Sequence, residues 1–228
     1  MKKQIVFLTI GEAPRLDLKE TYDTYFEGMK EVSQIGLLDN LSHEVAETLL
    51  GKRATTHNIL TSRFIDGYQI VMDHALVEAA LQKRIDELES QGVTAVILMC
   101  TGSFDHLKST DAVLIEAEKV TIPYVKEHYL SSKIGVLVPL ETQVNDSHDK
   151  WQLGERVLID YASPYNFDAK EFEKAANNFI QAGVSVIILD CIGYNMMMQR
   201  FMQEKVPGID VILSNELLFD YVVKKFID

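Results

Sequence analysis

The only two cysteines of this 228-residue chain lie near the ends of two stretches that match each other. "GVTAVILMCTG" covers 92–102 and "GVSVIILDCIG" covers 183–193, and aligned without a gap they share Gly, Val, Ile, Leu, Cys and Gly. A thiol titrates near pH ~8.5, and helix N-termini lower this value toward neutrality. A thiolate so placed can remove a proton, and a thiol can return one. Cys100 and Cys191 are therefore candidate acid/base residues.

Each cysteine follows a continuous apolar run, 93–99 or 184–190. Such runs are typical of parallel strands buried on both faces. Ligands of open α/β sheets bind beyond the carboxyl ends of the strands, where both cysteines are expected. Two duplicated lobes that face each other would put the thiols on opposite walls of one cleft. One thiolate would then remove a proton from a carbon and the other thiol would return one to the opposite face, which is the chemistry of a cofactor-independent racemase.

Two other interpretations stay open. Cysteine is often a small buried hydrophobic residue with no chemical role. A structural disulfide between Cys100 and Cys191 is the second alternative, although thiols are kept reduced in the cytoplasm, where we expect this chain. The chemical interpretation is favoured because the two residues occupy equivalent points of a duplicate, each with Gly two residues later.

The pattern of the chain predicts an α/β fold with two pseudo-symmetric lobes, each a mainly parallel sheet flanked by helices. A first lobe at 1–130 and a second at 131–213 are expected, with 214–228 able to pack back on the first. Asp66-Gly67 between two β-rich runs predicts an extra β-hairpin in the first lobe. Short apolar runs predict further strands at 4–10, 133–141, 156–164 and 209–213, and a strand or turn at 33–41. Helical apolar spacing and Gly stops predict helices at 17–33, 41–51, 73–92, 168–183 and after 213.

Composition excludes several classes of function. The net charge of −12 argues against nucleic acid and gives no reason to expect an anionic membrane. The apolar run near the N-terminus is too short for a signal peptide, and we expect a cytoplasmic protein. The histidines at 43, 57, 74, 106, 128 and 148 show no metal-ligand spacing, so no metal is expected. The first loop, "TIGEAPR", has no Gly-rich phosphate motif, which disfavours a nucleotide cofactor.

Several stretches resemble the AroM family, which is grouped by sequence with the aspartate/glutamate/hydantoin racemase superfamily. They are "LTIGEAPRLD" near the start, "IGLLDNLS" at 35–42, "LTSRFIDGYQIVMD" at 60–73, "VILMCTGSF" at 96–104, "KIGVLVPLETQ" at 133–143 and "ILDCIGYN" at 188–195. The resemblance covers nearly the whole chain. It implies a racemase-like fold, no cofactor, and acid/base roles for Cys100 and Cys191.

The resemblance also implies substrate-binding positions. Thr101, Gly102 and Ser103 fall where the superfamily surrounds a substrate carboxylate. The chain departs from the racemase pattern after each cysteine, with Thr101-Gly102 in place of Asn-Thr and Ile192-Gly193 in place of Thr-His. Because of those departures, the resemblance does not identify the substrate.

The other predicted substrate-binding residues come from their positions. Arg15, in the loop after the first strand, could pair with a carboxylate through two nitrogens, and a surface arginine is an equal alternative. Gly193, Tyr194 and Asn195 follow the second cysteine and could line its wall. Glu12 and Glu141 are more simply explained as helix N-terminal carboxylates, and Ser214-Asn215 could reach the site.

The leading hypothesis is a racemase- or isomerase-like enzyme acting next to a carboxylate of a small molecule. The alternative is a non-catalytic small-molecule binding or regulatory protein on the same fold. The sequence says little about oligomeric state, and a homodimer is compatible with it.

Overall fold

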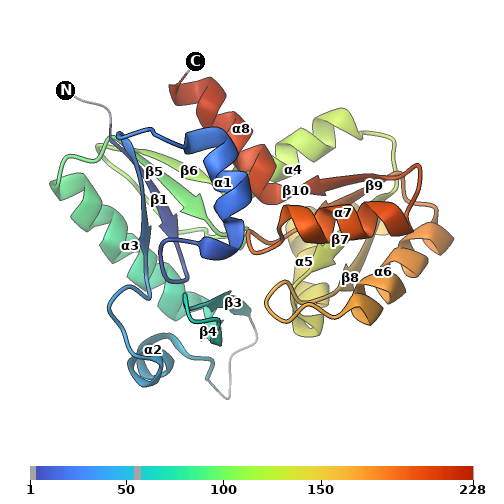
Figure 1. Ribbon diagram of the computed structural model, residues 1–228, viewed down its shortest axis with the longest axis horizontal. Coiled ribbons are helices and arrows are strands. Elements are labelled where there is room, and N and C mark those ends of the chain that lie inside the picture. Colours follow the sequence, from blue (N-terminus) through green and yellow to red (C-terminus); the bar gives the residue numbers. More distant parts are fainter. Residues whose placement is uncertain (1–3, 54–57, 228) are drawn as a thin grey trace. The chain divides into compact units, whose positions relative to one another are not determined.

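The computed structural model describes residues 4–53 and 58–227, and it divides into two compact units, Met1–Ala117 and Glu118–Asp228. Each unit is built on a four-stranded parallel sheet with helices against it, as Figure 1 shows, so the predicted α/β architecture is confirmed. The predicted division after residue 130 and the packing of 214–228 on the first lobe stay predictions.

Unit 1 contains ten elements among its described residues. In chain order they are β1 (Ile5–Thr9), the 3-10 turn η1 (Leu16–Leu18), α1 (Lys19–Phe26), β2 (Val32–Gly36), α2 (His43–Leu50), β3 (Ile59–Arg63), β4 (Gln69–Asp73), α3 (His74–Ser90), β5 (Ala95–Met99) and β6 (Val113–Glu116). The order of the parallel strands is β2-β1-β5-β6, so β1 and β5 are central.

Both faces of the central strands are buried, as their continuous apolar runs predict. Val6 and Leu8 of β1 share a core cluster with Val77 and Leu81 of α3. Phe7 points to the other face, where its ring lies 4.8 Å from the ring of Phe26 in α1. The alternation follows from the two-residue period of a strand.

The predicted hairpin is confirmed: β3 and β4 pair antiparallel, and Gly67 in the connecting loop has φ +95°. The predicted helix at 41–51 is also confirmed, as α2. The Ser42 hydroxyl accepts a hydrogen bond from the amide of Val45 at its N-terminus. The hairpin stacks beside α2 through Tyr68, whose ring lies 4.1 Å from that of His43.

The helix predicted at 17–33 is too long. A 3-10 turn and the short helix α1 replace it, and the helix ends at Phe26. Gly28 then has φ +79°, and Val32 begins β2, which pairs with β1 from Val32↔Ile5 onward. The helical spacing of the apolar residues runs on to Met29, beyond the end of α1 at Phe26.

Unit 2 contains α4 (Ala117–His128, which starts at the boundary), β7 (Ile134–Val138), the 3-10 turn η2 (Glu141–Gln143), α5 (Val144–Trp151), the 3-10 turn η3 (Gly154–Arg156), β8 (Val157–Tyr161), α6 (Ala169–Ala182), β9 (Val186–Leu189), α7 (Met196–Lys205), β10 (Asp210–Leu213) and α8 (Ser214–Phe226). Leu137 of β7 packs with Phe172 and Phe179 of α6. Val136 points to the opposite face, toward Val125 of α4 and Trp151 of α5.

The two sheets have the same topology. The order β8-β7-β9-β10 in unit 2 repeats β2-β1-β5-β6 in unit 1, so β7 corresponds to β1 and β9 to β5. The duplication seen around the cysteines therefore extends to the whole of each sheet. The hairpin β3–β4 lies between the second and third strands of unit 1, where the equivalent connection of unit 2 has only α6.

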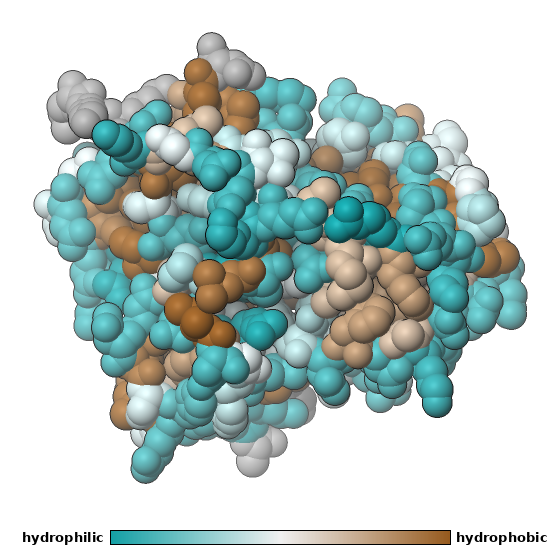
Figure 2. All heavy atoms as spheres, in the orientation of Figure 1, coloured by the Kyte–Doolittle hydropathy of each residue, from teal (hydrophilic) through white to brown (hydrophobic). Residues whose placement is uncertain are grey.

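Figure 2 shows that hydrophilic residues cover most of the visible surface, with smaller hydrophobic areas between them. Exposed large apolar side chains include Leu130 at 71% and Leu16 at 55% exposure. None of the described helices combines the length and the apolar character that crossing a membrane would need.

Candidate functional site

Cys100 directly follows β5, at the carboxyl end of a central strand of unit 1. Its side chain is buried, with 7% exposure, and its Sγ accepts a hydrogen bond from the amide of Gly102 at 3.4 Å. Gly102 lies against the hairpin, because a Cβ there would lie 2.8 Å from Cδ2 of Leu60 on β3. The extra hairpin thus packs directly against the loop that carries the first thiol.

Arg15 lies over the neighbouring strand end of the same unit. Its Nη1 donates to Oγ1 of Thr9, the last residue of β1, at 3.2 Å. Thr9 is in register with Met99, the residue before Cys100. The loop after β1 therefore brings the arginine to the same edge of the sheet as the first cysteine.

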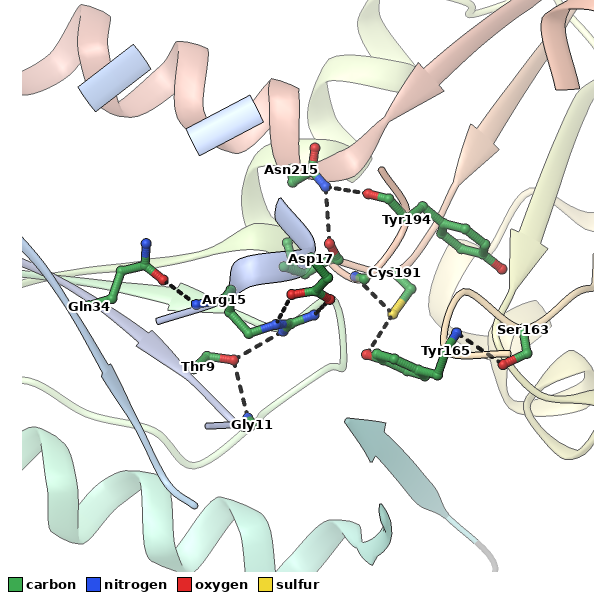
Figure 3. A network of polar contacts seen from close by, with 12 residues as sticks. Thr9, Gly11, Arg15, Asp17, Gln34, Ser163, Tyr165, Cys191, Tyr194 and Asn215 are labelled. Carbon is green, nitrogen blue, oxygen red and sulfur yellow. Dashed lines mark hydrogen bonds and ion pairs between the residues drawn. The ribbon is translucent and has the colours of Figure 1, made fainter. Parts of the chain in front are cut away.

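The guanidinium of Arg15 is already paired with a carboxylate. Nε donates to Oδ1 of Asp17 at 2.9 Å and Nη2 donates to Oδ2 at 2.7 Å, a two-point ion pair (Figure 3). The Arg15 side chain is 2% exposed and that of Asp17 11%. The predicted role of Arg15 in binding a ligand carboxylate is untested, but the structure shows that its forked edge accepts a carboxylate. A small pocket beside it includes Arg63 and Phe64 in its lining.

Thr101 and Ser103 lie in the loop after Cys100. Thr101 is buried, and the carbonyl of Ser103 lies 2.7 Å from Nε2 of His74 at the start of α3. The His74 ring stacks on Phe104, with ring centroids 4.9 Å apart. These contacts fix the path of the loop. Whether Thr101, Gly102 or Ser103 touches a ligand stays a prediction.

Cys191 occupies the equivalent place in unit 2, although β9 ends one residue earlier than β5, so that Asp190 lies between the strand and the cysteine. Its side chain is 8% exposed, and its Sγ accepts a hydrogen bond from the amide of Gly193 at 3.4 Å. The sulfur-to-amide contact of Cys100 is thus reproduced in residue spacing and in length. Cys100 and Cys191 are not joined by a disulfide, so that alternative is not supported.

The Tyr165 hydroxyl lies 3.6 Å from Sγ of Cys191, and either group can donate the hydrogen bond (Figure 3). Tyr165 comes from the loop between β8 and α6, where Oγ of Ser163 accepts a hydrogen bond from its amide. Sequence reasoning missed this residue, because no pattern links a tyrosine in one loop to a cysteine 26 residues later.

Asp190 anchors the chain immediately before Cys191. Its carboxylate accepts two hydrogen bonds from Nζ of Lys150, at 2.9 and 2.7 Å, and one from Nε1 of Trp151 at 2.9 Å. Its amide donates to the carbonyl of Leu137 in β7. Trp151 is fully buried and is also part of this anchor.

Ser214 and Asn215, at the start of α8, hold the loop from its other side. The Ser214 hydroxyl donates to the carbonyl of Leu189, and Nδ2 of Asn215 donates to the carbonyls of Ile192 and Tyr194 at 3.0 and 2.6 Å. Asn215 is fully buried, and among the described residues its Oδ1 has no hydrogen-bond partner. The pair orients the main chain of the Cys191 loop.

Tyr194 and Asn195 have structural contacts within unit 2. The Tyr194 hydroxyl donates to the carbonyl of Ala162 at 2.7 Å, and burial raises the pKa of this phenol well above its ordinary value. The side chain of Asn195 accepts a hydrogen bond from the amide of Met198 and caps α7. Their predicted contact with substrate is untested, as is that of Gly193.

The two glutamates at matching sequence positions differ in the structure. Oε2 of Glu12 accepts a hydrogen bond from the amide of Ile65 and ties the first loop to the hairpin, whereas Glu141 is exposed in η2. Across residues 4–53 and 58–227, no three His, Cys, Asp or Glu side chains gather as a metal site would require. His57 lies outside the described residues.

Solved structures with the same fold include three enzymes. A glutamate racemase isoform from Bacillus anthracis matches with a TM-score of 0.63 at 12% identity, covering 97% of this chain and 80% of that one. An allantoin racemase from Pseudomonas fluorescens matches with a TM-score of 0.61 at 14% identity, covering 97% and 91%. An unliganded arylmalonate decarboxylase matches with a TM-score of 0.56 at 13% identity, covering 98% and 92%. At these identities the similarity shows the fold.

No curated protein matches the sequence. The family model described as AroM protein matches residues 5–224, almost the whole chain. This match agrees with the duplicated parallel sheets and with the cysteine that follows the third strand of each. The chain belongs to the AroM family.

Proposed function

We propose that this protein is a cofactor-independent racemase- or isomerase-like enzyme that acts next to a carboxylate of a small molecule, with Cys100 and Cys191 as its acid and base. The observation that carries the proposal is the equivalence of the two thiols. Each follows the third strand of a sheet of the same topology, and each sulfur accepts a hydrogen bond from the amide two residues later at 3.4 Å.

The reaction balances with these groups alone. A thiolate forms an S–H bond as the substrate C–H bond breaks, and the electron pair left on carbon delocalises into the adjacent carboxylate. The second thiol then gives its proton to the opposite face of that carbon, so the enzyme ends with the proton on the other sulfur. Amide donors support this chemistry because they stabilise a thiolate. Solved structures of the same fold include racemases and a decarboxylase, which supports the proposal.

The test is exchange of the hydrogen next to a carboxylate. Amino acids and dicarboxylic acids are incubated with the protein in deuterated water, and loss of the C–H signal is followed by proton NMR. We expect exchange with at least one compound, and its loss in both Cys100→Ala and Cys191→Ala. Equal thermal unfolding midpoints, within a few degrees, would show that the variants are folded. Exchange that survives in both variants would contradict the proposal.

One observation favours the alternative of a non-catalytic binding protein. The residue after Cys191 is Ile192, which is buried and apolar where racemases carry a polar residue. Absence of exchange with every compound, together with saturable binding of a carboxylate by calorimetry, would support that function instead.

A further inference from the structure

The surroundings of Cys191 contain a feature that the proposed function does not use. The Tyr165 hydroxyl lies 3.6 Å from Sγ, within hydrogen-bond distance for sulfur, and the amide of Gly193 reaches the same sulfur at 3.4 Å. Two groups able to donate therefore converge on one thiol. A thiolate has no hydrogen to donate, so when Cys191 is ionised the hydrogen bond runs from the Tyr165 hydroxyl to sulfur.

Gly193 makes this contact possible. A Cβ at this position would lie 2.9 Å from Cε1, Cζ and the hydroxyl oxygen of Tyr165. Side-chain carbons do not come this close, so any larger residue would push the ring away. The glycine after Cys191 thus leaves room for the Tyr165 ring. At the equivalent position in unit 1, Gly102 leaves room for the aliphatic side chain of Leu60.

The loop that carries Tyr165 is itself ordered by local hydrogen bonds. Oγ of Ser163 accepts from the amides of Tyr165 and Asn166, at 3.2 and 3.3 Å, which closes a tight turn. The carbonyl of Ala162, next to this turn, accepts from the hydroxyl of Tyr194, which follows Gly193. The turn and the Cys191 loop are therefore joined by a second hydrogen bond besides the one at the sulfur.

We propose that Tyr165 is a positioning residue that stabilises the thiolate of Cys191 through its hydroxyl, and so makes Cys191 the proton-accepting thiol of the pair. The role of Cys191 as proton acceptor rests on the proposed function. The stabilisation of its thiolate does not, because it concerns one thiol in unit 2. The hydroxyl acts through the sulfur, since a hydrogen bond to the charged form favours that form.

The experiment follows the two thiols directly. The chain has only two cysteines, so protein labelled with ¹³C at cysteine Cβ gives two resonances, assigned with Cys100→Ser and Cys191→Ser. Their chemical shifts are recorded against pH in wild type and in Tyr165→Phe, which keeps the ring and removes the hydroxyl. We expect the Cys191 midpoint to rise by about one pH unit, a tenfold loss of thiolate at neutral pH, with Cys100 unchanged.

Two further variants make the test specific. Gly193→Ala displaces the ring and is expected to raise the Cys191 midpoint in the same direction. The double variant with Tyr165→Phe should titrate like Tyr165→Phe alone, because the hydroxyl is already absent. Tyr161→Phe, at the end of β8 with its ring 5.0 Å from Nζ of Lys174, is the matched control and should leave both resonances unchanged.

An unchanged or lowered Cys191 midpoint in Tyr165→Phe would overturn the inference, as would equal shifts of both thiols. Failure of the proposed function is distinguishable, because the titration needs no substrate. If the Cys191 midpoint is raised in Tyr165→Phe but no compound undergoes exchange, the result counts against the proposed enzyme activity and leaves the role of the Tyr165 hydroxyl intact. Where exchange is found, its pH profile should move with the Cys191 midpoint while KM changes less than kcat.

Discussion

At the scale of single residues, the sequence pointed to the cysteines because type, spacing and duplication agreed. It did not predict Asp17 as the partner of Arg15 or Tyr165 as the neighbour of Cys191. Those pairings depend on the geometry of loops, which spacing along the chain does not encode. Arg15 is an example. Its residue type predicted that it binds a carboxylate, and in the structure that carboxylate belongs to Asp17 of the same chain.

The Arg15–Asp17 pair yields a prediction. Asp17→Ala leaves a buried guanidinium without its two-point partner and is expected to destabilise the fold by about 3 kcal/mol. If the forked edge can also take a ligand carboxylate, added acetate or malonate will restore much of the lost thermal stability. The measurement is the unfolding midpoint of wild type and variant against carboxylate concentration.

Asp23→Ala is the matched control for that experiment. It removes the partner of the exposed Lys19 in α1, where solvent screens the charge, so added carboxylate should not raise its unfolding midpoint. Equal responses of both variants would mean a general salt effect and would count against a carboxylate site at Arg15.

At the scale of elements, continuous apolar runs predicted the central strands well because these strands are buried on both faces. The sequence pattern did not assign β6, which is only four residues long and ends in the buried Glu116. Nor did it assign α5, where only Ser147 and Trp151 are buried, or α4, which contains Pro123. These helices lack an apolar stripe or contain a residue that normally ends a helix.

The contact between Glu89 of α3 and the loop before β6 gives a prediction for pH. The Glu89 carboxylate accepts hydrogen bonds from the Ser109 hydroxyl and from the amides of Thr110, Asp111 and Ala112. These bonds, the one from Ser109 foremost, lower its pKa to about 2. Because the folded state holds the proton less tightly than the unfolded chain, this stabilisation is present above pH ~4.5 and is lost as pH falls toward about 2.

Glu89→Gln should therefore be less stable than wild type at neutral pH. The difference in the free energy of unfolding between the two proteins should become smaller as the pH falls from ~4.5 toward 2. Urea unfolding of both proteins at several pH values measures it. Thr94→Ala, which removes hydrogen bonds to the main chain of Gln4 in the same unit and involves no titrating side chain, should show a stability difference from wild type that does not change with pH. A constant difference for Glu89→Gln would refute the assignment.

At the scale of the whole molecule, the sequence predicted the duplication and the α/β fold, and the sheet orders confirm both. Each unit also has core clusters made only of its own residues, such as those built on α3 in unit 1 and on α6 in unit 2. The fold could be predicted to this extent because parallel strands joined by helices have few possible arrangements. The boundary between the units is marked by no turn or change in composition, and α4 begins there.

These separate cores predict that residues 118–228, expressed alone, retain a cooperative thermal transition and α/β circular dichroism. The same polypeptide should show no exchange activity, because Cys100 belongs to the other unit. Cys191→Ala in this shorter polypeptide serves as the control for background exchange. A non-cooperative transition would mean that unit 2 depends on unit 1 for its fold.

The anchor at Asp190 has a consequence for motion. Its carboxylate is held by Lys150 and Trp151, and its amide by β7, so the residue before Cys191 cannot shift unless a buried ion pair breaks. If the protein closes around a ligand, the second thiol will therefore act as a fixed point. The displacement must come from segments with fewer buried contacts.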